Sequence, residues 1–410
     1  MKTIVFHKNC YKKAGRTITK GKYFTRWNIM LLLGISSCPA FSQVPQPPSS
    51  AIPPTAEVRS TTEEDRLFFQ KTLKKAQQEN DAAQANLAIC YLQGKGVEQN
   101  VKEAARRGNA QAQYNLGMLY QNGTGVPQDP KKAVKWYTLA AEQGNAGAQY
   151  NLGCYYQEGK GVEQNSQEAV KWFTLAARQG IVPAQKNLGI SYLEGTGVQQ
   201  DPKEAAKWLG SAARQGDAQA QCYLGVFCQR GIGVKQDFEE AVQWFTKAAQ
   251  QGDFSSQYKL AMCYLEGTGV QQNFREAAKW LASAARQGDA KAQCYLGVIY
   301  QEGIGVKQDF EEAVQWFAKA AQQGYSLAQC NLAICYLQGT GVKQDFKEAF
   351  QWYAKAAQQG DPSAQYSVAI CYEKGYGVPR DLSRAKEWWE KAAAQGFKPA
   401  IQKLKEYSTH

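Results

Sequence analysis

The sequence predicts an all-α protein, a right-handed α-solenoid of stacked antiparallel helix pairs with a 36-residue period. Three markers predict it, because each keeps the same step over eight units. The first marker is a tryptophan, found at Trp136, Trp172, Trp208, Trp244, Trp280, Trp316, Trp352 and Trp388. The second is a glycine that recurs every 36 residues from Gly144 to Gly396. The third is a G-x-G-V segment whose first glycine recurs at the same interval from Gly123 to Gly375. A fixed period of this size indicates stacked supersecondary units.

The first helix of a unit can be followed in residues 217–252. Leu224, Gly225 and Cys228 lie at helical spacing and predict one buried stripe. Gly231 follows, where a residue in the left-handed conformation ends a helix. The small residue beside the leucine lets neighbouring helices approach closely.

A capping box opens the second helix of the same unit, where Asp237 offers an N-cap and Glu240 lies three residues later. Trp244 and Phe245 lie on the buried side of this helix, and Gly252 ends it. A lone pair cannot bury both of its faces, so each unit is stable only against its neighbours. We therefore expect a stack whose first helices line its concave side, with the tryptophan filling the gap between successive pairs.

The leader, residues 1–42, is expected to be a signal peptide. Its apolar run over 29–35 is shorter than the about 20 residues that span a membrane, so no transmembrane span is expected after processing. Small residues at Ala40 and Ser42 suit a cleavage point before residue 43. The residues that end at Cys38 also resemble a bacterial lipoprotein box, so a lipid anchor at Cys38 is the main alternative.

Two further segments follow the leader. Residues 43–60 are rich in proline and small polar residues, which predicts a disordered linker. Residues 61–410 carry about nine units, and the first is shortened because Gly94 lies only 29 residues before Gly123. A capping helix over 398–407 is expected to close the array, since polar replacement at a stack end is what a terminal cap requires.

The positive charge of the chain does not predict nucleic-acid binding. The formal net charge is +12, but residues 1–26 hold six lysines, two arginines and no acid. The remaining 40 basic residues face 36 acidic ones, a net charge of +4. A nucleic-acid surface needs basic residues clustered along the folded part of the chain.

The sequence contains no candidate catalytic or metal-binding residues. The two histidines are His7, in the leader, and His410, at the last position. Serine or cysteine nucleophiles therefore lack an internal histidine base, and histidine-based zinc sites are excluded. Recurring carboxylates such as Asp237 and Glu240 are explained by helix capping. The G-x-G-V turns are not phosphate loops, since no strand precedes them, and we predict no enzyme activity, metal or cofactor.

Nine of the eleven cysteines fall on first helices, from Cys90 to Cys371. Eleven cysteines in an exported protein would ordinarily indicate disulfides. Cys294 and Cys330 occupy equivalent places in adjacent units, but packed helices lie about 8–10 Å apart, beyond the usual Cα separation of about 4.4–6.8 Å across a disulfide. The pattern therefore favours small buried thiols over disulfides.

The repeated pattern resembles the Sel-1-like repeat family, a relative of the tetratricopeptide repeats. Its motif, A-x-x-x-L-G-x-x-Y-x-x-G-x-G-V followed by D-x-x-x-A and W-x-x-x-A-A-x-x-G, covers about residues 80–407. One copy consists of Ala292, Leu296, Gly297, Tyr300, Gly303, Gly305, Val306, Asp309, Ala313, Trp316, Ala320, Ala321 and Gly324. The resemblance implies an adaptor that assembles other proteins, in bacteria often exported and host-interacting. A cysteine-rich secreted branch is linked to β-lactam binding, but its pairing of a second-helix cysteine with the next unit is absent here.

In the tetratricopeptide-like arrangement, the positions two before and two after the central leucine of the first helix face a groove. The first position varies between units and the second is uniformly apolar. The candidate partner-binding residues are Tyr114, Tyr150, Lys186, Tyr258, Tyr366, Met118, Ile190, Met262, Ile334 and Ile370. The second set fits interior packing equally well. A glutamine that never varies, from Gln113 to Gln365, predicts a structural hydrogen bond.

These patterns predict an exported protein–protein interaction scaffold that binds a partner protein or peptide on its concave, helix-lined surface. The resemblance adds a role as a bacterial host-interaction factor. The expected location is secreted or periplasmic, with a lipoprotein at the cell envelope or delivery into a host cell as alternatives. A secreted β-lactam-binding or hydrolysing enzyme is the alternative function from another class, and a structural role in the envelope is a third.

Overall fold

The computed structural model of the chain describes residue 105 and residues 108–408, which fall into two compact units. We call residues 105–236 the N-terminal array and residues 237–408 the C-terminal array. The predicted signal peptide, linker and shortened first unit lie outside the described residues. The described part contains 17 helices and no strand, so the predicted all-α class is confirmed.

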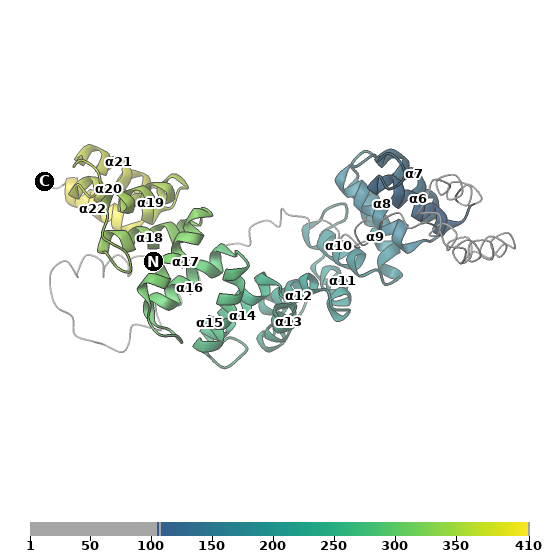
Figure 1. Ribbon diagram of the computed structural model, residues 1–410, viewed down its shortest axis with the longest axis horizontal. Coiled ribbons are helices and arrows are strands. Elements are labelled where there is room, and N and C mark those ends of the chain that lie inside the picture. The colour runs from purple at the N-terminus through teal and green to yellow at the C-terminus, as the bar shows by residue number, and fades with distance from the viewer. Residues whose placement is uncertain (1–104, 106–107, 409–410) are drawn as a thin grey trace, which may run out of the picture. The chain divides into compact units, whose positions relative to one another are not determined.

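The N-terminal array is a succession of seven helices, coloured blue to teal in Figure 1. They are α6 (Ala110–Asn122), α7 (Pro130–Glu142), α8 (Ala146–Glu158), α9 (Ser166–Arg178), α10 (Val182–Glu194), α11 (Pro202–Arg214) and α12 (Ala218–Arg230). Each helix packs against the helix before and after it in the array. The even-numbered helices are the predicted first helices, and the odd-numbered ones are the second.

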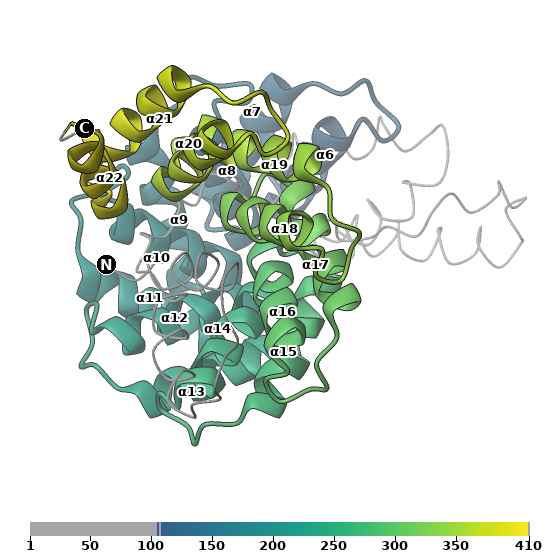
Figure 2. The same cartoon turned by 90° about the vertical axis from the view of Figure 1, so that its left-hand side faces the viewer.

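The C-terminal array continues the same pattern in ten helices, and Figure 2 shows α16 to α21 as successive packed pairs. They are α13 (Phe238–Gln250), α14 (Phe254–Glu266), α15 (Phe274–Arg286), α16 (Ala290–Glu302), α17 (Phe310–Gln322), α18 (Ser326–Gln338), α19 (Phe346–Gln358), α20 (Pro362–Lys374), α21 (Leu382–Ala394) and α22 (Lys398–Ser408). The last helix, α22, packs against α21. The expected stack of helix pairs at a 36-residue period is confirmed.

Only one of the two hydrogen bonds of the predicted capping box forms at the start of α13. Asp237 Oδ1 accepts a hydrogen bond from the Glu240 N–H at 2.9 Å. The Glu240 carboxylate does not return to the cap, since it accepts from the Trp244 indole at 3.1 Å. The equivalent unit shows why: the Asp309 N–H already donates to the Tyr300 carbonyl at 2.9 Å. A hydrogen bond between the two helices of a pair thus replaces the capping-box hydrogen bond to the glutamate side chain.

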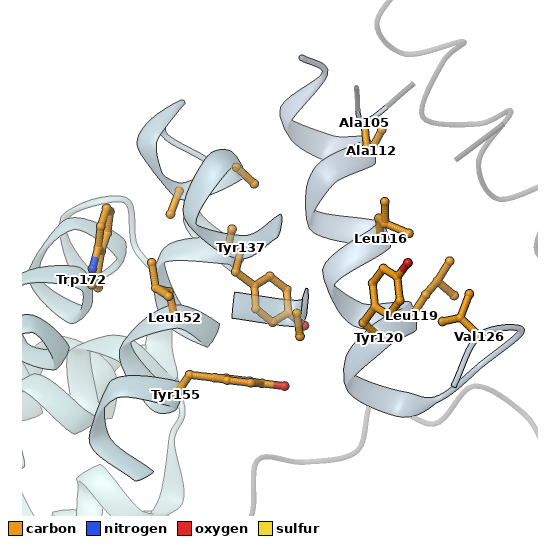
Figure 3. Packing of buried hydrophobic residues seen from close by; sticks show 14 residues of the cluster. Ala105, Ala112, Leu116, Leu119, Tyr120, Val126, Tyr137, Leu152, Tyr155 and Trp172 are labelled. Carbon is orange, nitrogen blue, oxygen red and sulfur yellow. The ribbon is translucent and has the colours of Figure 1, made fainter. Parts of the chain in front are cut away.

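The core of the N-terminal array runs through successive pairs. Figure 3 shows Tyr137 of α7 beside Leu152 and Tyr155 of α8, and Tyr137 is fully buried. A Cβ at Gly117 of α6 would lie 2.6 Å from the Tyr137 ring, so this close approach requires the small residue. Trp172 of α9 belongs to the same cluster, so the periodic tryptophan does fill the gap between pairs.

The most deeply buried large side chain of each second helix is the residue after the periodic tryptophan. These residues are at most 3% exposed, whereas most of the tryptophans are half-buried. They are Tyr137, Phe173, Leu209, Phe245, Leu281, Phe317, Tyr353 and Trp389. The tryptophan therefore seals the edge of the core, and its neighbour fills the centre.

The G-x-G-V turn joins each pair to the preceding one. Gly303 ends α16 with φ 68°, and Gly305 has φ 71°. A Cβ at Gly305 would lie 2.5 Å from the backbone carbonyl of Phe274, the first residue of α15. The equivalent Gly161 meets Pro130 of α7 in the same way. The second glycine is needed both for its backbone angle and for this contact between units.

The substitution Gly305→Ala is expected to destabilise the C-terminal array by about 1–3 kcal/mol more than Gly324→Ala, because overpacking adds this amount. Gly324 is the matched control, since its φ is also positive, at 87°, but nothing lies within 4 Å of an added Cβ. Both variants should lose about 1–2 kcal/mol for the left-handed backbone alone. Urea unfolding followed by circular dichroism measures the difference. Equal losses in the two variants would show that the turn does not hold the pairs together.

Candidate partner-binding surface

A buried glutamine on each first helix connects three helices. In the C-terminal array, the Gln293 side chain of α16 donates to the Ala285 carbonyl at the end of α15, at 3.0 Å. It also accepts from the Gln323 side chain, which follows α17, at 2.8 Å. Gln293 is only 5% exposed. The predicted structural hydrogen bond is confirmed, and it links each first helix to the second helices on both sides.

The same two hydrogen bonds recur along both arrays. The glutamines that make them are Gln113, Gln149, Gln185, Gln257, Gln293, Gln329 and Gln365. The residue after each glutamine is the first of the two candidate positions, two before the central leucine. The bonds therefore fix where this candidate side chain lies in every unit.

Four candidate residues at this position are half-buried tyrosines, Tyr114, Tyr150, Tyr258 and Tyr366. Each ring packs against an aromatic ring of its own or the next pair, with centroids 5.6–6.1 Å apart. Burial raises the pKa of the Tyr150 and Tyr258 hydroxyls above the ordinary range. These hydroxyls stay neutral at physiological pH and can both donate and accept hydrogen bonds.

The fifth candidate at this position, Lys186, makes an ion pair in the N-terminal array. Its Nζ lies 3.2 Å from Asp217 Oδ2, and the two side chains are 16% and 17% exposed. The other oxygen of Asp217 accepts from the Ala220 N–H at 2.7 Å and caps α12. The lysine charge is thus compensated between two neighbouring first helices.

The second candidate position contributes more to packing than to accessible surface. Met262 and Ile370 are buried, at 8% and 7% exposed. Met118 and Ile334 are half-buried and pack against core clusters. Ile190 is half-buried as well.

The position just before the central leucine was missed by the sequence reasoning. Tyr295 of α16 contacts Tyr258 of α14, and their ring centroids are 5.6 Å apart. The Asn331 side chain donates to Cys294 Sγ at 3.7 Å. These residues thus connect one first helix to the next. Variation between units, the signal that identified the first candidate position, could have found these residues too. Their position also varies between units, from asparagine to tyrosine, lysine and serine.

Of the eight cysteines on the described helices, six are buried and two are half-buried. Burial raises the pKa of Cys154, Cys263 and Cys371 to about 12. A thiol with such a pKa is a poor nucleophile and metal ligand near neutral pH, because the thiolate is the reactive form.

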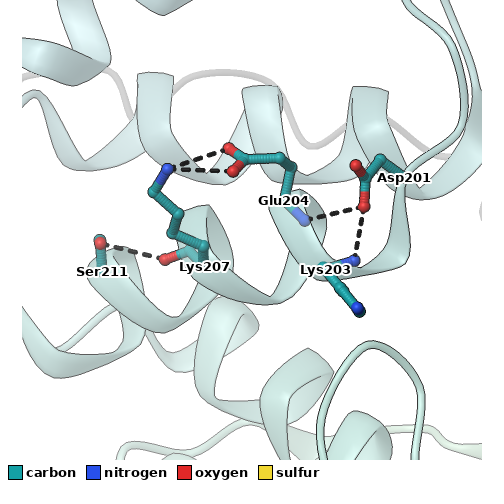
Figure 4. A network of polar contacts seen from close by, with 5 residues as sticks. All are labelled: Asp201, Lys203, Glu204, Lys207 and Ser211. Atoms are coloured by element: carbon teal, nitrogen blue, oxygen red, sulfur yellow. Dashed lines mark hydrogen bonds and ion pairs between the residues drawn. The ribbon is translucent and has the colours of Figure 1, made fainter.

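The recurring carboxylates are engaged by their own helices. At the start of α11, Asp201 accepts from the backbone N–H groups of Lys203 and Glu204 at 2.9 and 3.2 Å (Figure 4). The Glu204 carboxylate pairs with Lys207 one turn later at 3.0 Å. Over the described residues, no group of three histidine, cysteine, aspartate or glutamate side chains could hold a metal ion. No described helix is long and apolar enough to cross a membrane.

Stacked helix pairs of constant length, locked by one repeated hydrogen-bond pattern, define a helical repeat protein of the scaffold class. The family model of the Sel1 repeat matches nine segments of the chain: 81–106, 110–145, 146–181, 182–217, 218–253, 255–289, 290–325, 326–361 and 362–397. The chain belongs to the Sel1 repeat family, whose members generally mediate protein interactions.

Two solved structures are similar along most of the chain. One is c5321, described as a protective antigen present in uropathogenic Escherichia coli strains, with 34% identity, 82% of both chains covered and a TM-score of 0.65. The other is a Sel1 repeat protein from Oxalobacter formigenes, with 35% identity, 78% of this chain and 93% of that chain covered, and a TM-score of 0.61. No curated protein matches the sequence.

The thiols of Cys154, Cys263 and Cys371 are expected to react with iodoacetamide about a thousandfold more slowly in the folded protein than in the unfolded one. Their pKa of about 12 lies three units above the reference value of 9.0, and this lowers the thiolate fraction at pH 8 accordingly. Mass spectrometry of tryptic peptides measures each site, and guanidinium-unfolded protein is the control. Labelling of folded Cys263 at the unfolded rate would contradict the burial described here.

Proposed function

We propose that this protein is an exported protein–protein interaction scaffold that binds a partner protein or peptide on the surface lined by its first helices. The repeated glutamine bonds hold this surface in place, and the first candidate position on it varies between units. A position that the fold leaves free to vary is available for ligand recognition. This contrast between constant and variable positions of one helix carries the proposal.

The half-buried tyrosines are suited to this role. A tyrosine offers a flat apolar ring and a polar hydroxyl at little conformational cost, and it is enriched where proteins bind each other. Tyr114 and Tyr150 lie one unit apart in the N-terminal array, and Tyr258 and Tyr366 lie in the C-terminal array. An extended peptide or a helix that lies across successive first helices would contact this position in each unit.

Export and host interaction complete the proposal. The basic leader with its short apolar run supports export, with a lipid anchor at Cys38 as the alternative form. The similar protein c5321 is described as a protective antigen of uropathogenic Escherichia coli. This similarity supports a role at the bacterial envelope or in the host for the present chain.

A photo-crosslinking residue placed at Tyr258 in the full chain is expected to capture a partner protein from the envelope fraction or from host cells. The matched control places the same residue at Gln315, which is exposed on the second helix α17. The combined substitutions Tyr258→Ala and Tyr366→Ala should weaken binding of the captured partner at least about tenfold, as for interface aromatics generally. Equal capture at the two sites, or turnover of nitrocefin by the purified protein, would overturn the proposal.

A further inference from the structure

A cavity of about 730 Å³ lies in the C-terminal array between α15, the C-terminal half of α16 and the turn that follows α16. Figure 1 shows these two helices as neighbours. The volume falls within the range of about 300–1,000 Å³ that ligand pockets occupy. No residue of the candidate partner-binding surface lines this cavity, so it is a separate place on the molecule.

Three cations and no carboxylate line the cavity. Arg275 and Lys279 lie one turn apart on α15, and Lys307 lies in the turn that follows α16. Neither Arg275 nor Lys307 makes a side-chain ion pair with any residue that the structure describes. Lys279 lies 3.6 Å from Glu276, but both side chains are well exposed, and such a surface pair is weak. The cavity therefore has positive charge available for an anionic ligand.

The fold does not require these cations. The three cations occur together in only two of the eight full units, at Arg275, Lys279 and Lys307 and, 72 residues earlier, at Lys203, Lys207 and Lys235. Other units carry uncharged or acidic residues at the same positions, among them Gln167, Glu239, Gln243, Gln271, Glu311 and Gln315. These units form the same helix pairs, so the charges are free to serve a ligand.

The floor of the cavity is apolar. Ala278 and Leu296 are 5% and 1% exposed, and Val306 lines the same space. Tyr300 adds a ring with a hydroxyl. A small inorganic anion would gain from the cations but would leave this floor uncovered. A ligand that contacts both needs more than one anionic group and a short apolar group between them.

We infer that this cavity binds an acidic peptide segment of a partner protein, in which carboxylates flank a small apolar side chain. The apolar side chain covers Ala278 and Leu296, and the carboxylates reach Arg275 and Lys279 on α15 and Lys307 in the turn. Arginine suits such a site because its planar guanidinium can bind a carboxylate through two hydrogen bonds.

The test uses the full chain and a labelled peptide, Asp-Glu-photoleucine-Glu-Asp, whose central residue crosslinks on illumination. We expect saturable binding by fluorescence polarisation and crosslinks that map to residues 275–307. The triple substitution Arg275→Gln, Lys279→Gln and Lys307→Gln should remove these crosslinks. The equivalent set of cations 72 residues earlier is removed by Lys203→Gln, Lys207→Gln and Lys235→Gln. In that background, the triple substitution at residues 275, 279 and 307 should also weaken peptide binding at least about tenfold. Glutamine is present at each of these positions in other units, so folding should be retained.

The matched control, Lys131→Gln, Lys135→Gln and Lys343→Gln, removes the same charge from units without the three-cation set and should leave the crosslinks unchanged. Tyr258→Ala should leave them unchanged as well, which separates this site from the proposed first-helix surface. Three outcomes would overturn the inference: crosslinks that persist in the triple variant, equal binding of the neutral peptide Asn-Gln-photoleucine-Gln-Asn, or displacement of the peptide by an equal concentration of pyrophosphate.

Discussion

The buried glutamine of each first helix is the interaction on which the rest of the structure depends. It donates to a carbonyl at the end of the preceding second helix and accepts from a glutamine after the following one, as at Gln293. A hydrogen bond of this kind contributes about 0.5–1.5 kcal/mol, but an unpaired buried partner costs about 1–3 kcal/mol. The bonds therefore specify how successive pairs align, and apolar burial between the pairs stabilises that alignment.

This alignment separates positions that the fold constrains from positions that it leaves free. The glutamine and the glycines of the turn keep their identity, and the leucine is replaced only by Val368, since each contacts a neighbouring helix. The residue after the glutamine varies, and so do the three positions occupied by Arg275, Lys279 and Lys307. A repeat protein of this kind can acquire binding sites unit by unit, because a substitution at a free position leaves the repeated glutamine hydrogen bonds intact.

Most of the fold could be predicted from the sequence, because a strict 36-residue period fixes the number, length and order of the helices. Contacts between helices were harder to predict from the sequence. Glu240 was expected to complete a capping box, but it binds the Trp244 indole, because in equivalent units the cap N–H is held by the preceding first helix. For the candidate surface, the sequence identified the positions but not their burial. Met262 and Ile370 are buried by neighbouring pairs, and the contact of Tyr295 with Tyr258 depends on how adjacent first helices meet.

Hydrogen exchange on the variant Gln293→Leu tests the role of the glutamine most directly. Leucine leaves the Ala285 carbonyl without its side-chain donor and the Gln323 amide without its acceptor. Loss of these two hydrogen bonds, together about 2 kcal/mol, would speed exchange of the amides in α15 to α17 about 30-fold. The exposed Gln315→Leu should leave their exchange unchanged. Equal protection in Gln293→Leu and the unaltered protein would contradict the account.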